Sequence, residues 1–284
     1  MTLTLTLGKR IAFFACITLF CYMLMALLLQ LVLGHTGQQT VWLRIMAVAQ
    51  DLIMFILPAL VTALFCTRLP AQFLAINSGI PRGMTIIAVC TLICSIPAMN
   101  ALIMWNESIH LPGNLEATFR AAEEAAQAQV TLLLGPNTIM NFIVSLLIVG
   151  VLAGLSEELF FRGAFQRLLT TGRWNVHTAV WLVAFIFSAV HMQFYGFFPR
   201  MLLGAFFGYA LVWSGSLWLP VILHVLNNSV YIFGRYFLGD DMANASAVDT
   251  IGADSIPLIV ISVVLTALGL TILYRRRVRP DAEN

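Results

Sequence analysis

Long stretches without charge recur along the whole chain, and this feature most constrains the fold. Only 15 Lys+Arg and 13 Asp+Glu serve 284 residues, so 10% of the residues are charged and 60% are hydrophobic. A soluble globular chain carries about 25% charged residues. Runs of about 20 apolar residues cross a bilayer core of ~30 Å as helices, which satisfy their own backbone hydrogen bonds in lipid. The composition therefore predicts an all-α, polytopic integral membrane protein.

Eight apolar segments have the length and composition expected of transmembrane helices. They are 11–33, 42–66, 83–104, 137–168, 175–193, 199–213, 217–237 and 256–274. The fifth and sixth segments are short and are separated by Tyr195-Gly196 and Pro199-Arg200. A re-entrant or tilted pair is the alternative there, so seven spans stay open beside the eight that we expect.

The few charged residues are distributed asymmetrically between the two ends of these helices. If eight helices alternate, one side receives Lys9, Arg10, Arg68, Arg82, Arg167, Arg173, Arg275, Arg276, Arg277 and Arg279. The other side receives Glu107, Glu116, Glu123, Glu124, Asp240, Asp241, Asp249 and Asp254. Because cytoplasmic loops carry the excess of Lys and Arg, this pattern predicts that both termini are cytoplasmic.

One segment between the apolar runs, 114–130, is rich in alanine, glutamate and glutamine. These residues favour a helix, and the charges place it outside the hydrocarbon. A lid over a substrate site and a simple connector are both compatible with it. We favour the connector because the apolar face of the segment is weak.

Ionisable residues inside the apolar segments are few, and such residues are candidates for function because lipid disfavours charge. They are Asp51, Glu157, Glu158, Arg162, His191 and His224, with Asn228 as a polar companion. The four-residue step from Glu158 to Arg162 places both side chains on one helix face, where they neutralise each other. Glu157 is rotated ~100° away and has no local cation, which suits a general base. The alternative is that both acids pair with arginines and only stabilise the fold.

The two histidines occur in short patterns of their own. His191 follows Phe187 by one helical turn, and a lone histidine on such a helix is usually a hydrogen-bonded core residue. His224 and Asn228 are four residues apart, so they point the same way and can donate two hydrogen bonds to one oxygen, as an oxyanion hole requires. An interhelical polar contact is the alternative. At 1.5 Å per residue, Glu157, His191, His224 and Asn228 meet at a similar depth below the cytoplasmic face.

The three patterns Glu157-Glu158-x-x-x-Arg162, Phe187-x-x-x-His191 and His224-x-x-x-Asn228 resemble the motifs of the CPBP family of intramembrane proteases, which includes the CAAX prenyl endopeptidases and bacteriocin-processing relatives. The resemblance implies that Glu157 is the catalytic glutamate and activates a water together with His191. It implies that His224 and Asn228 stabilise the oxyanion and that Glu158 and Arg162 support the site. The family has been described both as zinc-dependent and as metal-independent, so the motifs leave the cofactor open.

Several alternatives stay open beside a metal-independent glutamate protease. A zinc enzyme would bind its metal through Glu157, His191 and His224. A serine nucleophile would have to be Ser156 or Ser188. A proton-coupled transporter would use the same polar groups as a relay, although no inverted repeat is evident.

Three parts of the chain follow from these observations. Residues 1–136 hold three transmembrane helices and the extramembrane helix, 137–237 form the CAAX protease-like core, and 238–284 hold an acidic loop, the last helix and a basic tail. Asp51 lies in the second span, where Arg44, two turns earlier, is one partner open to it, and we favour a structural polar contact over a catalytic role. The expected partners are a peptide or membrane-protein substrate and membrane lipid, in a bacterial inner membrane. A nucleic-acid surface is excluded because the net charge is +2 and Lys9 is the single lysine.

Overall fold

The computed structural model describes residues 6–32, 39–172, 174–238 and 250–278. The structure is 82% helical, and these described residues form no strand. The expected all-α class is therefore confirmed. Among the charges used above for orientation, Arg173, Asp240, Asp241, Asp249 and Arg279 lie outside the described residues.

Apolar runs form the helices, and prolines and polar residues delimit them. The first part contains α1 (Leu7–Val32), α2 (Gln39–Gln50), the π-helical turn η1 (Asp51–Ile56), α3 (Leu57–Cys66), α4 (Pro70–Phe73), α5 (Met84–Cys94), α6 (Ile96–Glu107) and α7 (Asn114–Leu134). In α3, α4, α6 and α15 (Ile256–Arg275) a proline occupies the first or second helical position. A proline is tolerated there because the first N–H groups of a helix have no intrahelical partner.

The central part is one long helical run followed by three shorter helices. It contains α8 (Ile139–Ser145), η2 (Leu146–Leu152), α9 (Ala153–Glu158), η3 (Leu159–Gln166), α10 (Arg167–Thr171), α11 (Val176–Ala189), the short turn η4 (Phe194–Gly196), α12 (Phe197–Ser214) and α13 (Trp218–Leu238). The turns η1, η2 and η3 are π-helical, a geometry that is rare and concentrates at functional sites. Asp51 begins η1, and η3 begins directly after Glu158.

The number of membrane spans is the point at which the expectation of eight is not confirmed. Five helices of the described residues are long and apolar enough to cross: Leu7–Gln30, Thr40–Cys66, Ile139–Thr171, Phe194–Ser214 and Ile256–Arg275. The pair α5 and α6 makes a sixth if it counts as one span, but it bends by 44°. Pro97 explains a break here because its ring clashes with the preceding turn. The apolar helix α11 is shorter than a full span, and α13 carries polar residues along its length.

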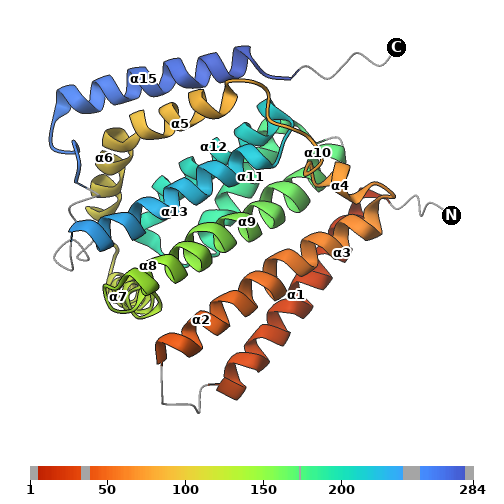
Figure 1. The fold of residues 1–284 in the computed structure, drawn as a ribbon, viewed down its shortest axis with the longest axis horizontal. Helices are drawn as coiled ribbons and strands as arrows, with labels where there is room; N and C mark the ends of the chain where they lie inside the picture. The colour runs from red at the N-terminus through yellow and green to blue at the C-terminus, as the bar shows by residue number, and fades with distance from the viewer. Residues whose placement is uncertain (1–5, 33–38, 173, 239–249, 279–284) are drawn as a thin grey trace.

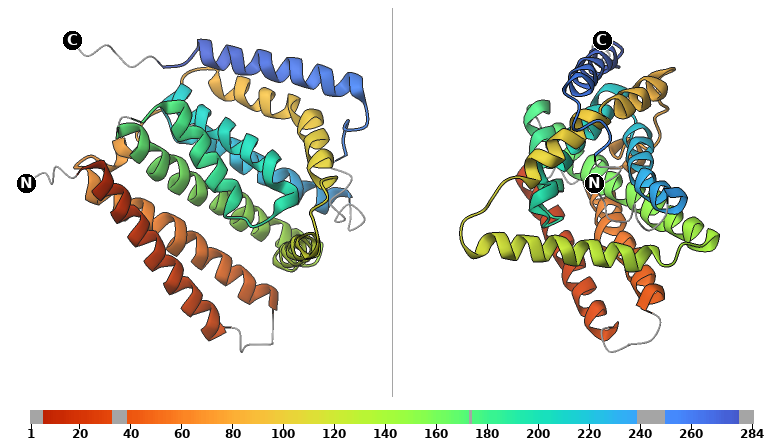
Figure 2. Two further views of the ribbon diagram at one scale, coloured as in Figure 1. Left: turned by 180° about the vertical axis from the view of Figure 1, so that it is seen from behind. Right: turned by 90° about the vertical axis from the view of Figure 1, so that its left-hand side faces the viewer.

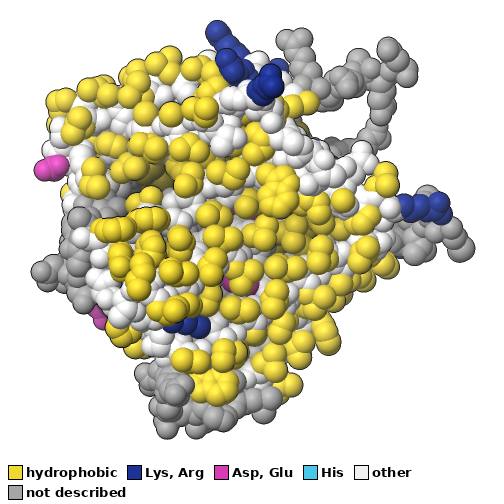
Figure 3. Space-filling view, viewed as in Figure 1, with side chains coloured by type: hydrophobic (Ala, Val, Ile, Leu, Met, Phe, Trp, Pro, Cys, Tyr) yellow, Lys and Arg dark blue, Asp and Glu magenta, His cyan; other side chains and the backbone are white. Residues whose placement is uncertain are grey.

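The helices form a bundle whose two ends differ. Figure 1 shows that the start of α1 and the end of α15 lie at the same end of the bundle. Helix α7 lies at the opposite end and crosses the other helices, as the right-hand view of Figure 2 shows. This helix extends the expected segment 114–130 to Leu134. Figure 3 shows that apolar side chains cover one face of the bundle and that most charges lie near its margins, as expected of a surface in contact with lipid.

Close packing in the central part brings the site helices together. Gly154 of α9 lies against Val225 of α13, and a Cβ at Gly154 would come within 3.1 Å of the Val225 backbone nitrogen. Gly204 of α12 lies similarly close to Phe187 of α11 and to the Arg162 guanidinium. These two glycines therefore let α9, α11, α12 and α13 approach closely enough for polar side chains to meet between them.

Candidate active site

A fully buried ion pair forms the base of the site. Glu158 Oε1 accepts a hydrogen bond from Arg162 Nη1 at 2.6 Å, and neither side chain is exposed. Arg162 Nη2 also donates to the carbonyl oxygen of Gly204 at 2.9 Å, and its guanidinium lies 4.5 Å from the Phe187 ring centroid. The predicted pairing of Glu158 with Arg162 along one helix is confirmed. Its contacts tie η3 to α11 and α12.

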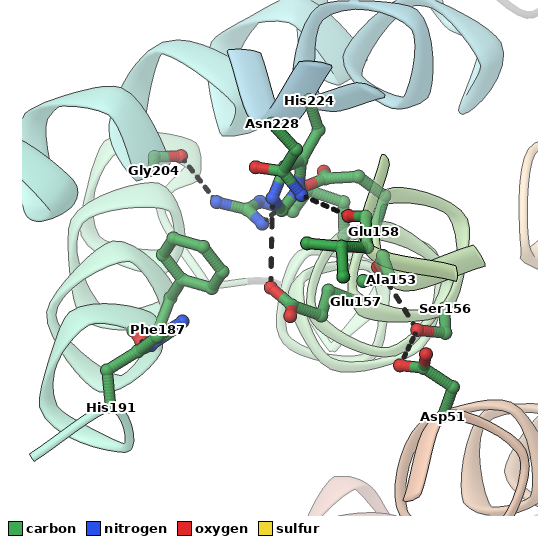
Figure 4. A network of polar contacts seen from close by, with 12 residues as sticks. Asp51, Ala153, Ser156, Glu157, Glu158, Phe187, His191, Gly204, His224 and Asn228 are labelled. Carbon is green, nitrogen blue, oxygen red and sulfur yellow. Dashed lines mark hydrogen bonds and ion pairs between the residues drawn. The ribbon is translucent and has the colours of Figure 1, made fainter. Parts of the chain in front are cut away.

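His224 of α13 is held by the same carboxylate. Its Nδ1 lies 2.7 Å from Glu158 Oε1, so this nitrogen carries a proton and donates to the carboxylate. The Phe207 ring stacks on the imidazole at 5.1 Å between centroids, and the Phe187 ring meets it edge-on at 5.8 Å. Two aromatic walls and one ion-paired carboxylate thus fix the orientation of His224, and its second nitrogen faces Glu157 (Figure 4).

Glu157 differs from its neighbour in burial and in partners. Its Oε2 lies 3.8 Å from His224 Nε2, and its side chain is 16% exposed, whereas that of Glu158 is 0% exposed. Within the described part of the chain, the Oε2 atoms of both Glu157 and Glu158 are buried and accept no hydrogen bond, so exposure and the ion pair with Arg162 are what distinguish the two acids. A partly exposed carboxylate that is not ion-paired with an arginine can accept a proton from a water, which is the property expected of a general base.

His191 lies beyond the end of α11, and its environment fixes which nitrogen is basic. Its Nδ1 lies 2.7 Å from the Phe187 carbonyl oxygen, so Nδ1 donates and Nε2 carries the lone pair in the neutral ring. The charges of Glu157 and His224 act on His191, although no hydrogen bond to either is formed. Phe187 joins the two histidines, because its ring also lies 5.1 Å from that of His191.

His191 lies at the end of the site that faces α7. Gln193, two residues after His191, contacts α7, which lies at the end of the bundle away from the start of α1. The expectation that all four residues meet at a similar depth below the cytoplasmic face stays a prediction. The site reaches from the middle of the bundle toward the α7 end, because His191 follows the end of α11 there.

Asn228 lies one turn after His224 on α13, as expected. Its Nδ2 donates to the carbonyl oxygen of Val149 in η2 at 3.1 Å. An amide NH₂ group has two donors, so one N–H is left for another acceptor. Figure 4 shows the Asn228 amide beside His224. The pair therefore presents donors on one side of Glu157.

Asp51 enters the site through a contact that the sequence did not indicate. Ser156 Oγ donates to Asp51 Oδ1 at 2.7 Å, and it lies next to Glu157 in the chain. The pairing of Asp51 with Arg44 that the sequence left open is not formed, because Arg44 binds Asn141 and the last carbonyl groups of α7. A polar contact between a serine and an acid 105 residues apart leaves no periodic signal in the sequence.

The structure does not favour the alternative of a serine nucleophile at Ser156 or Ser188. Ser156 and Ser188 are both fully buried. Ser156 donates to Asp51, and Ser188 Oγ donates to the Phe197 carbonyl oxygen at 2.7 Å. A nucleophilic hydroxyl needs an adjacent base and access to the substrate, and these two hydroxyls lack access.

The three donors of the alternative zinc enzyme do not form a metal site. Across the ranges that the structure describes, no three His, Cys, Asp or Glu side chains lie close enough together to hold a metal ion. Of the set Glu157, His191 and His224, Glu157 lies 3.8 Å from His224 Nε2 and forms no ion pair with His191. A three-ligand catalytic zinc site needs all three donors at about 2 Å from one point. The residues therefore do not fit the metal in this arrangement.

In a comparison with known proteins, the central part of the chain matches a protein family. Residues 139–230 match the family described as type II CAAX prenyl endopeptidase Rce1-like. No curated protein and no solved structure matches the chain significantly. The matched range begins at the start of α8 and ends within α13, so it contains every residue of the polar network except Asp51.

Proposed function

We propose that this membrane protein, whose residues 139–230 match the Rce1-like family of CAAX prenyl endopeptidases, is an intramembrane endopeptidase whose general base is Glu157. The observation that carries the proposal is the unequal environment of two adjacent acids. Glu158 is fully buried and bound to Arg162 and His224, whereas Glu157 is 16% exposed and its Oε2 lies 3.8 Å from His224 Nε2.

The water that attacks the peptide bond is activated between Glu157 and His191. Glu157 accepts one proton from this water, and His191 Nε2 accepts a hydrogen bond from its other proton. As the water oxygen bonds to the carbonyl carbon, the electron pair of the C=O bond moves to the carbonyl oxygen. A general base placed in this way contributes about 10²–10⁴-fold to a rate.

The resulting oxyanion is stabilised by His224 Nε2–H and the remaining N–H of Asn228. With Nδ1 already donating to Glu158, a proton on Nε2 makes His224 an imidazolium, and the buried carboxylate of Glu158 offsets its charge. Collapse of the intermediate breaks the C–N bond, and the proton on Glu157 passes to the leaving nitrogen. Removing one donor of such a site costs about 10²–10³-fold in kcat.

Glu158 and Arg162 are positioning residues in this proposal. They do not touch the substrate, and their role is to orient His224 and to keep its charge compensated. The proposed reaction needs no metal ion. Elemental analysis of purified, active protein tests this part, and stoichiometric zinc whose removal abolishes cleavage would contradict it.

The substrate is a peptide or a membrane-associated protein, and a CAAX-like C-terminal segment is the class that the family suggests. The apolar surface in Figure 3 supports a location in a lipid bilayer, through which the substrate reaches the site. We place the protein in a bacterial inner membrane with both termini cytoplasmic, because the ends of the helices near both termini carry the basic residues.

Substitution of the base tests the proposal directly. Purified Glu157→Ala protein in liposomes should cleave a farnesylated CAAX peptide at least about 10²-fold more slowly than wild type. Glu124→Ala is the control, because Glu124 is exposed on α7 and should cleave normally. Full cleavage by Glu157→Ala protein of the correct fold would refute the assignment.

A further inference from the structure

Helix α7 contacts three consecutive residues, 193–195, that follow His191 closely in the chain. Glu123 Oε1 accepts a hydrogen bond from Gln193 Nε2 at 2.9 Å. The Phe119 ring lies 5.6 Å from that of Phe194, and the Arg120 guanidinium lies 4.5 Å above the ring of Tyr195. One turn of α7 therefore contacts three consecutive residues of a segment that begins two positions after His191.

The backbone around His191 depends on such support. Helix α11 ends at Ala189, and the His191 N–H makes only a long bond of 3.4 Å to the Ser188 carbonyl oxygen. Met192 has a φ angle of 56°, a left-handed conformation that residues with a side chain rarely adopt. A backbone held in this region persists only when its surroundings fix it, and this is most often found at functional sites.

A second link joins the same segment to α12. Gln193 Oε1 accepts a hydrogen bond from Arg200 Nη2 at 2.9 Å, so the amide of Gln193 bridges Glu123 and Arg200. Arg200 lies close enough to Glu157 and His191 for their charges to interact. Its guanidinium therefore connects Gln193 to the two groups that activate the water in the proposed reaction.

We propose that Glu123, Gln193 and Arg200, here called the α7 clamp, position His191 for catalysis, so that α7 belongs to the catalytic apparatus and is more than a connector. The inference rests on the proposed function, because it assigns the residues that place one of its catalytic groups. Glu123, Gln193 and Arg200 are positioning residues that act through His191.

Paired substitutions on α7 test the clamp with a matched control. Glu123→Ala removes the acceptor for Gln193, whereas Glu124→Ala changes the neighbouring, exposed acid. With a farnesylated CAAX peptide and protein in liposomes, we expect Glu123→Ala to lower kcat by about tenfold at nearly constant KM, because misplaced catalytic groups slow the chemical step. Glu124→Ala should match wild type. Glu123→Gln keeps an acceptor oxygen and should recover most of the loss.

Exchange of the two side chains is a sharper measurement. Gln193→Glu alone places two carboxylates against each other and should lower kcat. Adding Glu123→Gln gives an amide that donates to Glu at position 193, which then also accepts from Arg200. Recovery of kcat in the double variant measures coupling between the positions, which an independent loss of stability at each would not produce.

The outcomes separate the inference from the function on which it rests. If Glu157→Ala is inactive and Glu123→Ala matches wild type or changes KM alone, the clamp is refuted and the protease function stands. If Glu157→Ala cleaves like wild type, the function fails. If wild type does not cleave the peptide, the CAAX-like substrate is refuted, and amide hydrogen exchange decides on the clamp. Amide hydrogen exchange at residues 190–196 that is unchanged by Glu123→Ala would overturn the α7 clamp, and faster hydrogen exchange there would support it.

Discussion

The buried pair of Glu158 and Arg162 gives the most demanding prediction, because stability and activity should respond differently to its removal. Glu158→Gln leaves a guanidinium with no exposed surface and removes the carboxylate to which it is hydrogen-bonded. Losing one partner of a buried ion pair costs about 3–5 kcal/mol of stability. The upper half of this range applies here, since Arg162 makes a 2.6 Å bond to Glu158 and the pair is fully enclosed.

The double variant Glu158→Gln with Arg162→Met removes both charges and should recover most of this stability. Replacing both partners of a buried pair by groups of similar volume is often neutral or stabilising. Catalysis should not recover, because His224 Nδ1 then donates to a neutral amide and its imidazolium form is no longer offset. The single variant should therefore be unstable and slow, and the double variant stable and slow.

Thermal unfolding in detergent, followed by tryptophan fluorescence, gives the stability of each variant, and peptide cleavage in liposomes gives kcat. Glu124→Ala is the control for both measurements. A double variant that is as unstable as the single one would refute the reasoning on charge. A stable double variant with wild-type kcat would show that Glu158 does not act through His224.

Three further predictions follow from other contacts. Gly154→Ala should push α13 away from α9, because the new Cβ would meet the Val225 backbone at 3.1 Å, and it should lower kcat and thermal stability together; a fully active, stable variant would contradict this. Burial raises the pKa of Glu123, so the folded state favours the protonated carboxyl group. The stability that this preference contributes is lost as the pH rises above the pKa of the unfolded chain, about 4.3. Above that pH, the unfolding temperature of Glu123→Gln should therefore increase relative to that of wild type. A difference between the two unfolding temperatures that does not change with pH would contradict this prediction. Asp51→Asn keeps an acceptor for Ser156 and should cleave nearly normally, whereas a loss as large as that of Glu157→Ala would assign Asp51 a catalytic role.

Local patterns in the sequence predicted those parts of the site that lie within one helix. The four-residue step gave the Glu158 and Arg162 pair, and the same step placed His224 and Asn228 on one face of α13. Contacts between helices left no such signal. The bond from Glu158 to His224 spans 66 residues, and that from Ser156 to Asp51 spans 105.

The helical segments were also predictable, since each apolar run forms helix, but the number of spans was not. A run of apolar residues does not reveal a bend such as the one between α5 and α6. The partner of Asp51 was not predictable for a related reason. Arg44 lies on the same helical run as Asp51, but it turns to the end of α7, where unpaired carbonyl groups provide stronger acceptors.

Two identical acids in adjacent positions acquire different chemistry from their surroundings. Glu158 points between α11, α12 and α13, where Arg162 and His224 saturate one of its oxygens and exclude water. Glu157 points about 100° away around the helix, keeps partial exposure and is not ion-paired with Arg162. Pairs of titratable groups whose environments differ in this way divide orienting and proton-transfer roles between them. Exchange of either acid for glutamine should therefore stop the reaction at different points: Glu157→Gln should leave His224 oriented and remove the base, and Glu158→Gln should retain the base and weaken the oxyanion donor.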